Sequence, residues 1–192
     1  MAEQPRWPAT LAGEGLRRKV AERRRIRRRL RLLALTVLVA ALLAASAGAR
    51  LPVLLVWNAS ASAPLGLYAV RSGALPRRGD MVVAWVPGPA RSLAAARHYL
   101  PANVPLVKRV AAAPGDRLCA RGPDIRINGR LVAKRLERDR SGRPMPWWTG
   151  CRRLEANELF LLTDSPQSFD GRYFGVTRKS DIVGSAGLLW AF

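Results

Sequence analysis

The chain has 192 residues, of which 33 are Lys or Arg and 13 are Asp or Glu, so its net charge is +20 and its length suits one domain with a hydrophobic core. Two cysteines and one histidine, widely spaced, do not form a metal-ligand cluster, and we expect no metal or cofactor. A Ser-His-Asp triad would need His98, whose Arg, Ala and Leu neighbours predict a short amphipathic helix over 90–100 and not a catalytic loop.

The first 31 residues are basic, with 11 Arg or Lys against three Glu, and the charge stops abruptly after Arg31. The following 18 uncharged residues, 32–49, would span about 27 Å as a helix, close to a hydrocarbon core of about 30 Å. Arginines beside such a helix stay in the cytoplasm. We therefore predict a cytoplasmic leader over 1–31, a single transmembrane anchor in the lipid bilayer over 32–49, and a periplasmic domain over 50–192, all at the inner (cytoplasmic) membrane.

Two alternatives exist for this N-terminal region. The small residues 45–49 could form a signal-peptide cleavage site, although the apolar run and the basic leader are both long for a signal peptide. The arginine run could bind nucleic acid, but its junction with a membrane-length apolar run favours anionic lipid headgroups. We therefore expect a retained anchor and no nucleic acid partner.

Beyond Arg50 the sequence changes to short runs rich in β-forming residues, separated by Gly and Pro. Turn signals such as Arg78-Gly79-Asp80 and Asn128-Gly129 punctuate these runs. The pattern predicts a mostly β domain. The expected strands are 51–57, 66–71, 81–86, 105–111, 125–127, 159–162 and 182–190.

Ser62 and Lys108 are candidates for a nucleophile and its base because of the residues that surround them in the sequence. Only four of the 33 basic residues are lysines, and Lys108 is surrounded by Leu, Val and Ala. Burial can remove the proton of an ammonium, which a guanidinium retains, and it can lower a lysine pKa by about 3 to 5 units from about 10.4. Lys108 is then a candidate general base for Ser62, whose attack on a carbonyl would give an acyl-enzyme that water hydrolyses.

Four blocks occur in the order expected for type I signal peptidases, and the chain resembles this family over about residues 30–192. The blocks are Ser62 with the proline that follows it, 79–83, Lys108-Arg109-Val110 with Pro114-Gly115-Asp116, and 168–175. The spacing of polar and Gly residues over 58–68 and the run 172–175 resemble the conjugative-transfer branch, the TraF type, whose members mature pilin subunits. The resemblance implies a signal-peptidase-like β domain that cleaves a protein substrate, such as a prepilin, after a small residue.

The resemblance also implies roles for individual residues. Ser62 would be the nucleophile and Lys108 the general base, while the Ser60 side chain and the Ser62 backbone N–H would form the oxyanion hole. Ser168 would orient the lysine. A supporting ion pair beneath the site would consist of Asp170 and Arg172.

Two features depart from the wider family pattern. One residue instead of two separates Ser62 from Pro64, and Gly171 stands where a serine is common. Both departures are compatible with the TraF type, but they weaken any transfer of the wider family's substrate preferences.

Each of these residues has an ordinary explanation when taken alone. The serines could lie in a turn, the amine of Lys108 could reach water, and Asp170 and Arg172 could be a surface pair. The rival function is that of a non-catalytic, membrane-tethered β domain acting as an assembly factor, and a third is a soluble Ser/Lys autoprotease of the repressor-cleavage type. The four blocks, in order behind a predicted anchor, favour the peptidase.

Cys119 and Cys151 are the two cysteines. In an oxidising compartment they could close a loop of about 32 residues, which is worth about 3 to 4 kcal/mol in the chain-entropy model. In the cytoplasm both thiols should be free, so the disulfide and the orientation of the domain are linked predictions.

Overall fold

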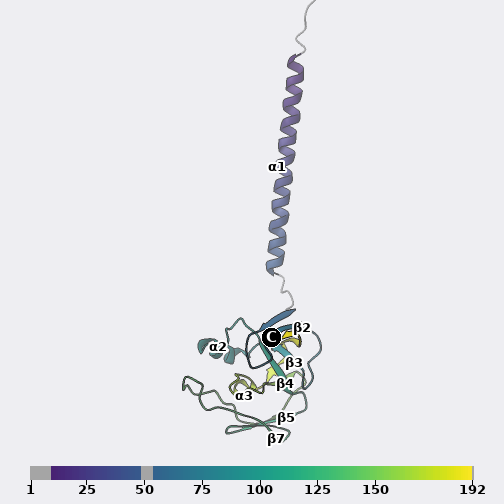
Figure 1. Cartoon of the computed structure of the whole chain (residues 1–192). Coiled ribbons are helices and arrows are strands. Elements are labelled where there is room, and N and C mark those ends of the chain that lie inside the picture. The colour runs from purple at the N-terminus through teal and green to yellow at the C-terminus, as the bar shows by residue number, and fades with distance from the viewer. Residues whose placement is uncertain (1–9, 49–53, 192) are drawn as a thin grey trace, which may run out of the picture. The chain divides into compact units, whose positions relative to one another are not determined.

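The computed structural model describes residues 10–48 and 54–191 (Figure 1). Residues 1–9 of the predicted leader, the end of the predicted anchor at Ala49, and the start of the predicted strand over 51–57 lie outside the described residues. Contacts divide the chain into two units, Met1–Leu51 and Pro52–Phe192.

The first unit contains one long helix, α1, over Thr10–Gly48. Arg, Leu and Ala dominate this segment, and residues 16–47 contain no Gly or Pro, so helix propensity is high over that stretch. Its described Leu and Val side chains are exposed, for example Val37 at 66% and Leu42 at 61%. Within the described residues, no helix offers an apolar stretch of the length needed to cross a membrane. The anchor over 32–49 therefore stays a prediction.

The second unit contains a seven-stranded sheet in which all neighbouring strands are antiparallel. This sheet confirms the predicted mostly β fold, and the strand expected over 66–71 has those same bounds. In spatial order the strands are β1 (Leu55–Asn58), β2 (Gly66–Arg71), β11 (Ile182–Ala191), β3 (Met81–Ala84), β4 (Leu106–Ala112), β9 (Glu158–Leu162) and β10 (Thr177–Arg178).

A second, four-stranded antiparallel sheet has the order β7 (Arg130–Lys134), β6 (Asp124–Ile127), β5 (Arg117–Arg121) and β8 (Gly150–Arg153). Only β6 was among the predicted strands. The expected turn at Asn128-Gly129 joins β6 to β7, and both residues have the positive φ that this turn requires, 51° and 82°. Cys119 of β5 lies directly opposite Cys151 of β8, and the two form a disulfide.

Three short helical segments complete this unit: α2 (Gly88–Ala96), α3 (Gly171–Phe174) and the 3-10 turn Lys179–Asp181. The prediction of a helix over 90–100 was wrong at its C-terminal end, because α2 stops at Ala96. His98 adopts a left-handed backbone with φ of 57°, and its N–H donates to the Ala95 carbonyl. The single histidine is exposed, but it lies after the helix and not on a helix face.

Strand β9 is buried on both faces and joins two parts of the core. Leu159 and Leu161 pack with Val82, Val86, Leu106 and Val110 on one face of the seven-stranded sheet. Phe160 and Leu162 face the other way, into a cluster with residues of the four-stranded sheet such as Leu118 and Ile125. A side chain of β4 that shares the face of Leu106 and Val110 is therefore surrounded by apolar groups.

Candidate active site

Lys108 occupies this apolar face of β4. It lies between Leu106 and Val110 along the strand and opposite Val82 of β3, and it is 4% exposed. Burial lowers the pKa of Lys108 from 10.5 to about 8, the negative charge of Asp170 acts to raise it, and the positive charge of Arg172 acts to lower it. At pH 7, roughly one molecule in ten then carries a neutral amine, compared with about one in 2,500 for a solvated lysine.

Ser60 and Ser62 lie in the loop between β1 and β2, and the buried side chain of Asn58 organises this loop. The Asn58 amide nitrogen donates to the carbonyls of Ser60, Ala63 and Pro64 at 3.0, 3.1 and 3.0 Å. Its amide oxygen accepts from the Ser60 N–H at 3.1 Å. One side chain at the end of β1 therefore fixes the path of the loop on both sides of Ser62.

The two predicted catalytic groups are in contact. Lys108 Nζ donates to Ser62 Oγ at 2.8 Å and to Ser168 Oγ at 2.7 Å. Ser60 Oγ is 2.9 Å from Ser62 Oγ and accepts from the Ser62 N–H at 3.4 Å. The distance between the lysine nitrogen and the Ser62 hydroxyl lies within the range for direct proton transfer, and the Ser60 hydroxyl contacts both the hydroxyl and the backbone N–H of Ser62.

Asp170 and Arg172 support the segment that carries Ser168. Asp170 caps α3 by accepting from the Arg172 N–H at 3.1 Å, and it accepts from the Thr163 N–H at 3.2 Å. The Arg172 guanidinium is 3.7 Å from the carboxylate and donates to the Ser165 carbonyl at 2.6 Å. Burial raises the pKa of the Asp170 carboxyl, against the opposing effect of Arg172. The two side chains are 0% and 3% exposed, so they are not a surface pair.

A groove of about 960 Å³ gives access to Ser62 and Lys108. Its walls are β1 and the serine loop, the start of β4, the segment around Ser168, and the loop over 136–145. The pairing of β4 with β9 begins at Arg109, so among the described strands Leu106 and Val107 pair only with β3. The start of β4 therefore borders the groove with one side not covered by a strand.

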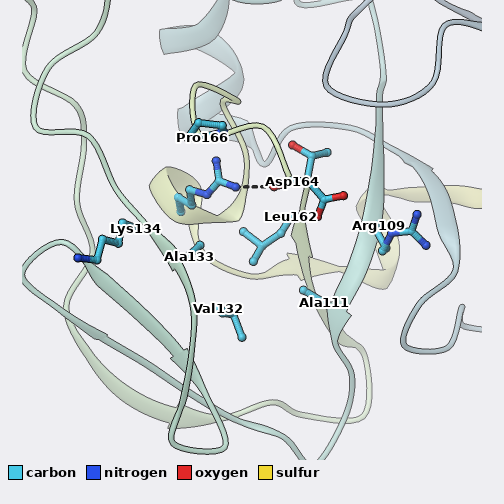
Figure 2. Close-up of a pocket in the computed structure, with 10 residues that line it drawn as sticks. Arg109, Ala111, Val132, Ala133, Lys134, Leu162, Asp164 and Pro166 are labelled. Atoms are coloured by element: carbon cyan, nitrogen blue, oxygen red, sulfur yellow. Dashed lines mark hydrogen bonds between the residues drawn. The ribbon is translucent and has the colours of Figure 1, made fainter.

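A smaller pocket of about 350 Å³ lies where β4 and β9 meet β7 of the other sheet (Figure 2). Figure 2 shows that the charged ends of Arg109 and Lys134 point away from each other, with Leu162 and Ala133 between them. This pocket contains neither predicted catalytic residue. The groove that contains both is the candidate active site.

Some of the residues that build the site had no role assigned from sequence. Asn58 belongs to the spaced motif over 58–68. Its position two residues before Ser60 is a signal from which its role in organising the serine loop could have been predicted. Tyr68 belongs to the same motif, and its hydroxyl donates to the Pro64 carbonyl at 2.8 Å. Thr163 and Tyr99 carry no comparable local signal, because their contacts depend on segments distant in sequence.

Comparisons with known proteins agree on one family. The family model for signal peptidase, peptidase S26, matches residues 26–191. A plasmid transfer protein TraF of Escherichia coli is 32% identical over 158 residues, which cover 75% of this chain and 85% of that protein. A second protein of that name from the same species is 39% identical over 82 residues, 41% of this chain, and that match spans only 46% of the relative's length.

Two further similarities complete the comparison. A probable conjugal transfer protein TraF of Sinorhizobium fredii is 32% identical over 139 residues, which cover 67% of this chain and 73% of that protein. The crystal structure of a signal peptidase I from Enterococcus faecalis is 20% identical, with a TM-score of 0.35, and the match covers 59% of this chain and 98% of that one. The family assignment rests on the sequence matches.

Proposed function

Because the chain belongs to the peptidase S26 family of signal peptidases, in its TraF branch, we propose that it is a serine endopeptidase that uses Ser62 and Lys108 as a catalytic dyad. The observation that supports this most directly is the 2.8 Å contact between Ser62 Oγ and a lysine amine that is 4% exposed. A buried amine with a pKa of about 8 can accept a proton near neutral pH, which no arginine at this position could do.

The proposed reaction has two halves. Neutral Lys108 takes the proton of Ser62 as its oxygen attacks the scissile carbonyl, and the resulting ammonium then protonates the leaving amine, so that an acyl-enzyme forms on Ser62. Water, deprotonated by the same amine, then attacks the ester; the ammonium returns this proton to the departing Ser62 oxygen, and the product is released with its new carboxyl end. The negative charge on the carbonyl oxygen in each half would be stabilised by the Ser62 N–H and the Ser60 hydroxyl.

Ser168 and the pair formed by Asp170 and Arg172 would act through Lys108. The Ser168 hydroxyl holds the amine at 2.7 Å and so fixes its direction toward Ser62. Asp170 favours the charged form of the amine, which keeps its pKa from falling further. These residues are positioning residues, since they are not expected to touch the substrate.

We propose that the substrate enters the groove as an extended strand beside the start of β4, where the strand edge is not paired with β9. The names of the relatives refer to plasmid and conjugal transfer. They support a client that is a pilin-like subunit of a conjugative transfer or type IV secretion system. Cleavage after a small residue is the expectation that follows from the family.

The location that we propose is the inner membrane, with α1 as a retained anchor and the peptidase domain in the periplasm. The basic residues before residue 32 and the exposed Leu and Val side chains of α1 support this orientation. Exposed apolar side chains also occur on the two strands that flank β2 and are suited to contact with lipid, namely Leu55 and Trp57 of β1 and Leu188, Leu189 and Trp190 of β11. A disulfide between Cys119 and Cys151 fits an oxidising compartment.

The test compares the wild type with Ser62→Ala and Lys108→Arg on a pilin precursor of a conjugative system, in membranes, with the product identified by mass spectrometry. Matched controls are Ser92→Ala, an exposed serine of α2, and Lys134→Arg, an exposed lysine of β7. We expect the controls to cleave at the wild-type rate and the dyad variants to lose at least about 10³-fold in rate. Equal processing by all five proteins would contradict the mechanism. Full pilus assembly with Ser62→Ala would favour the non-catalytic assembly factor.

A further inference from the structure

Four arginines form one wall of the groove that contains Ser62 and Lys108. This arginine wall consists of Arg97, which follows α2, and Arg138, Arg140 and Arg143 of the loop between β7 and β8. The loop is closed by its own contacts, because the Asp139 carboxylate accepts from the backbone N–H groups of Ser141 and Arg143 at 2.9 and 2.8 Å. The guanidinium groups of Arg138, Arg140 and Arg143 are therefore carried by a preorganised turn.

The charges of this wall are not balanced within the groove. Asp139 is the one carboxylate among the described residues that line it, and it is already bound by Arg143 Nε at 2.7 Å and by the Tyr99 hydroxyl at 2.5 Å. The other three arginines donate to uncharged oxygens. These contacts are Arg97 to the Pro144 carbonyl, Arg138 to the Gly142 carbonyl, and Arg140 to the Gln167 side chain.

A short series of contacts connects the wall to the dyad. Lys108 Nζ holds Ser168, and the next residue, Phe169, packs its ring against Tyr99 at a centroid distance of 5.1 Å. The Tyr99 hydroxyl accepts from Arg97 at 3.4 Å and donates to Asp139. An extended peptide advances about 3.3 Å per residue, so a polypeptide bound at Ser62 can reach the wall within a few residues.

We propose that the arginine wall binds acidic side chains of the polypeptide substrate, within a few residues of the scissile bond. The inference rests on the proposed function and narrows the substrate to a polypeptide with Asp or Glu beside its cleavage site. Guanidinium groups suit this task because they remain charged and can donate two parallel hydrogen bonds to one carboxylate. The present partners of Arg97, Arg138 and Arg140 are neutral oxygens, which water can satisfy when a substrate carboxylate takes their place at the guanidinium.

The experiment measures binding and not turnover, so a failure of catalysis cannot be mistaken for a failure of this inference. Full-length Ser62→Ala protein in detergent is titrated into a fluorescent alanine-based decapeptide with three consecutive Glu residues, and into its Gln counterpart. The same titrations are repeated with Ser62→Ala protein that also carries Arg138→Gln and Arg140→Gln. The control adds Arg121→Gln and Arg130→Gln, which remove the same charge from exposed positions of β5 and β7 outside the groove.

We expect the Glu peptide to bind at least about 10-fold more tightly than the Gln peptide at low ionic strength, and this preference to shrink in high salt. The variant with Arg138→Gln and Arg140→Gln in the groove should lose most of the preference for the Glu peptide. The control variant with Arg121→Gln and Arg130→Gln should keep it. Equal binding of the two peptides would overturn the proposal, and so would an equal loss in the control pair. A single-stranded oligonucleotide could compete with the Glu peptide for the same arginines. The proposal would also be overturned if the oligonucleotide displaced the peptide at one tenth of the peptide's concentration, and if the Arg138→Gln and Arg140→Gln pair abolished that displacement.

Discussion

Replacing Lys108 by Met tests whether the buried amine destabilises the folded chain while it is protonated. A pKa that falls from 10.5 to about 8 corresponds to about 3 kcal/mol of disfavoured charge. Below pH 8 the amine is protonated in both the folded and the unfolded chain, so the folded wild type bears this full cost. Between pH 8 and 10.5 the folded amine is neutral while the unfolded amine is still protonated, so the stability of the wild type rises with pH.

Lys108→Met has no such titration, but it leaves the buried Ser168 hydroxyl without its amine partner. This loss costs about 1 to 3 kcal/mol and does not depend on pH. We therefore expect the free energy of unfolding of Lys108→Met, minus that of the wild type, to fall by about 3 kcal/mol between pH 7 and pH 10.5. Its value at any single pH is less informative than this change.

Urea denaturation of the full chain in detergent, followed by tryptophan fluorescence at several pH values, measures the difference. Trp148 reports on the core because it packs edge-on against Phe160, with ring centroids 6.1 Å apart. Lys134→Met, at an exposed position of β7, is the control and should give a difference that stays flat with pH. A flat difference for Lys108→Met as well would refute the burial argument.

Three further predictions concern the serine loop, the oxyanion and α3. Asn58→Ala removes the hydrogen bonds that hold the loop, so we expect a loss of about 2 to 4 kcal/mol in urea denaturation together with lower kcat; retention of both would show that the loop holds its path without the amide. Ser60→Ala should lower kcat in peptide cleavage by about 10²-fold with KM little changed, because its hydroxyl would act on the developing oxyanion, and an unchanged kcat would exclude that role. Gly171→Ser places a Cβ atom 2.7 Å from both the Leu161 carbonyl oxygen and Phe160 Cε2, so it should destabilise the chain by about 1 to 3 kcal/mol; wild-type stability on denaturation would contradict the packing described for α3.

The strands of the seven-stranded sheet were largely predictable because their residues are mostly apolar or alternate clearly between apolar and polar. β2 and β9 have buried positions that match their hydrophobic residues, and their predicted and observed bounds agree within one residue. The four-stranded sheet was mostly missed. Strand β8 contains two arginines and is exposed along its whole length, so its β structure depends on pairing with β5 and on the disulfide more than on hydrophobic pattern. Strand β5 does alternate, but its buried residues Leu118 and Ala120 lie in a five-residue run that begins and ends with arginine.

The candidate site was predictable where the local sequence is unusual. An apolar neighbourhood identified Lys108, and the order of the four blocks identified Ser62, Ser168 and Asp170 as its neighbours. The arginine wall was not predictable, because an arginine-rich chain offers many similar residues and only the fold brings Arg97 beside Arg143. The early end of α2 was missed for a related reason, since the left-handed turn at His98 is fixed by contacts and is rare for a residue with a side chain.

The most direct test is titration of the Lys108 amine by NMR in protein labelled only at lysine. The chain has four lysines, so Lys108→Met assigns the signal by its disappearance. We predict that this signal titrates with a midpoint near 8, as expected for a buried amine that contacts Ser62. A midpoint near the reference value of about 10.4 would contradict the account, because the amine would then be charged whenever the enzyme is expected to work.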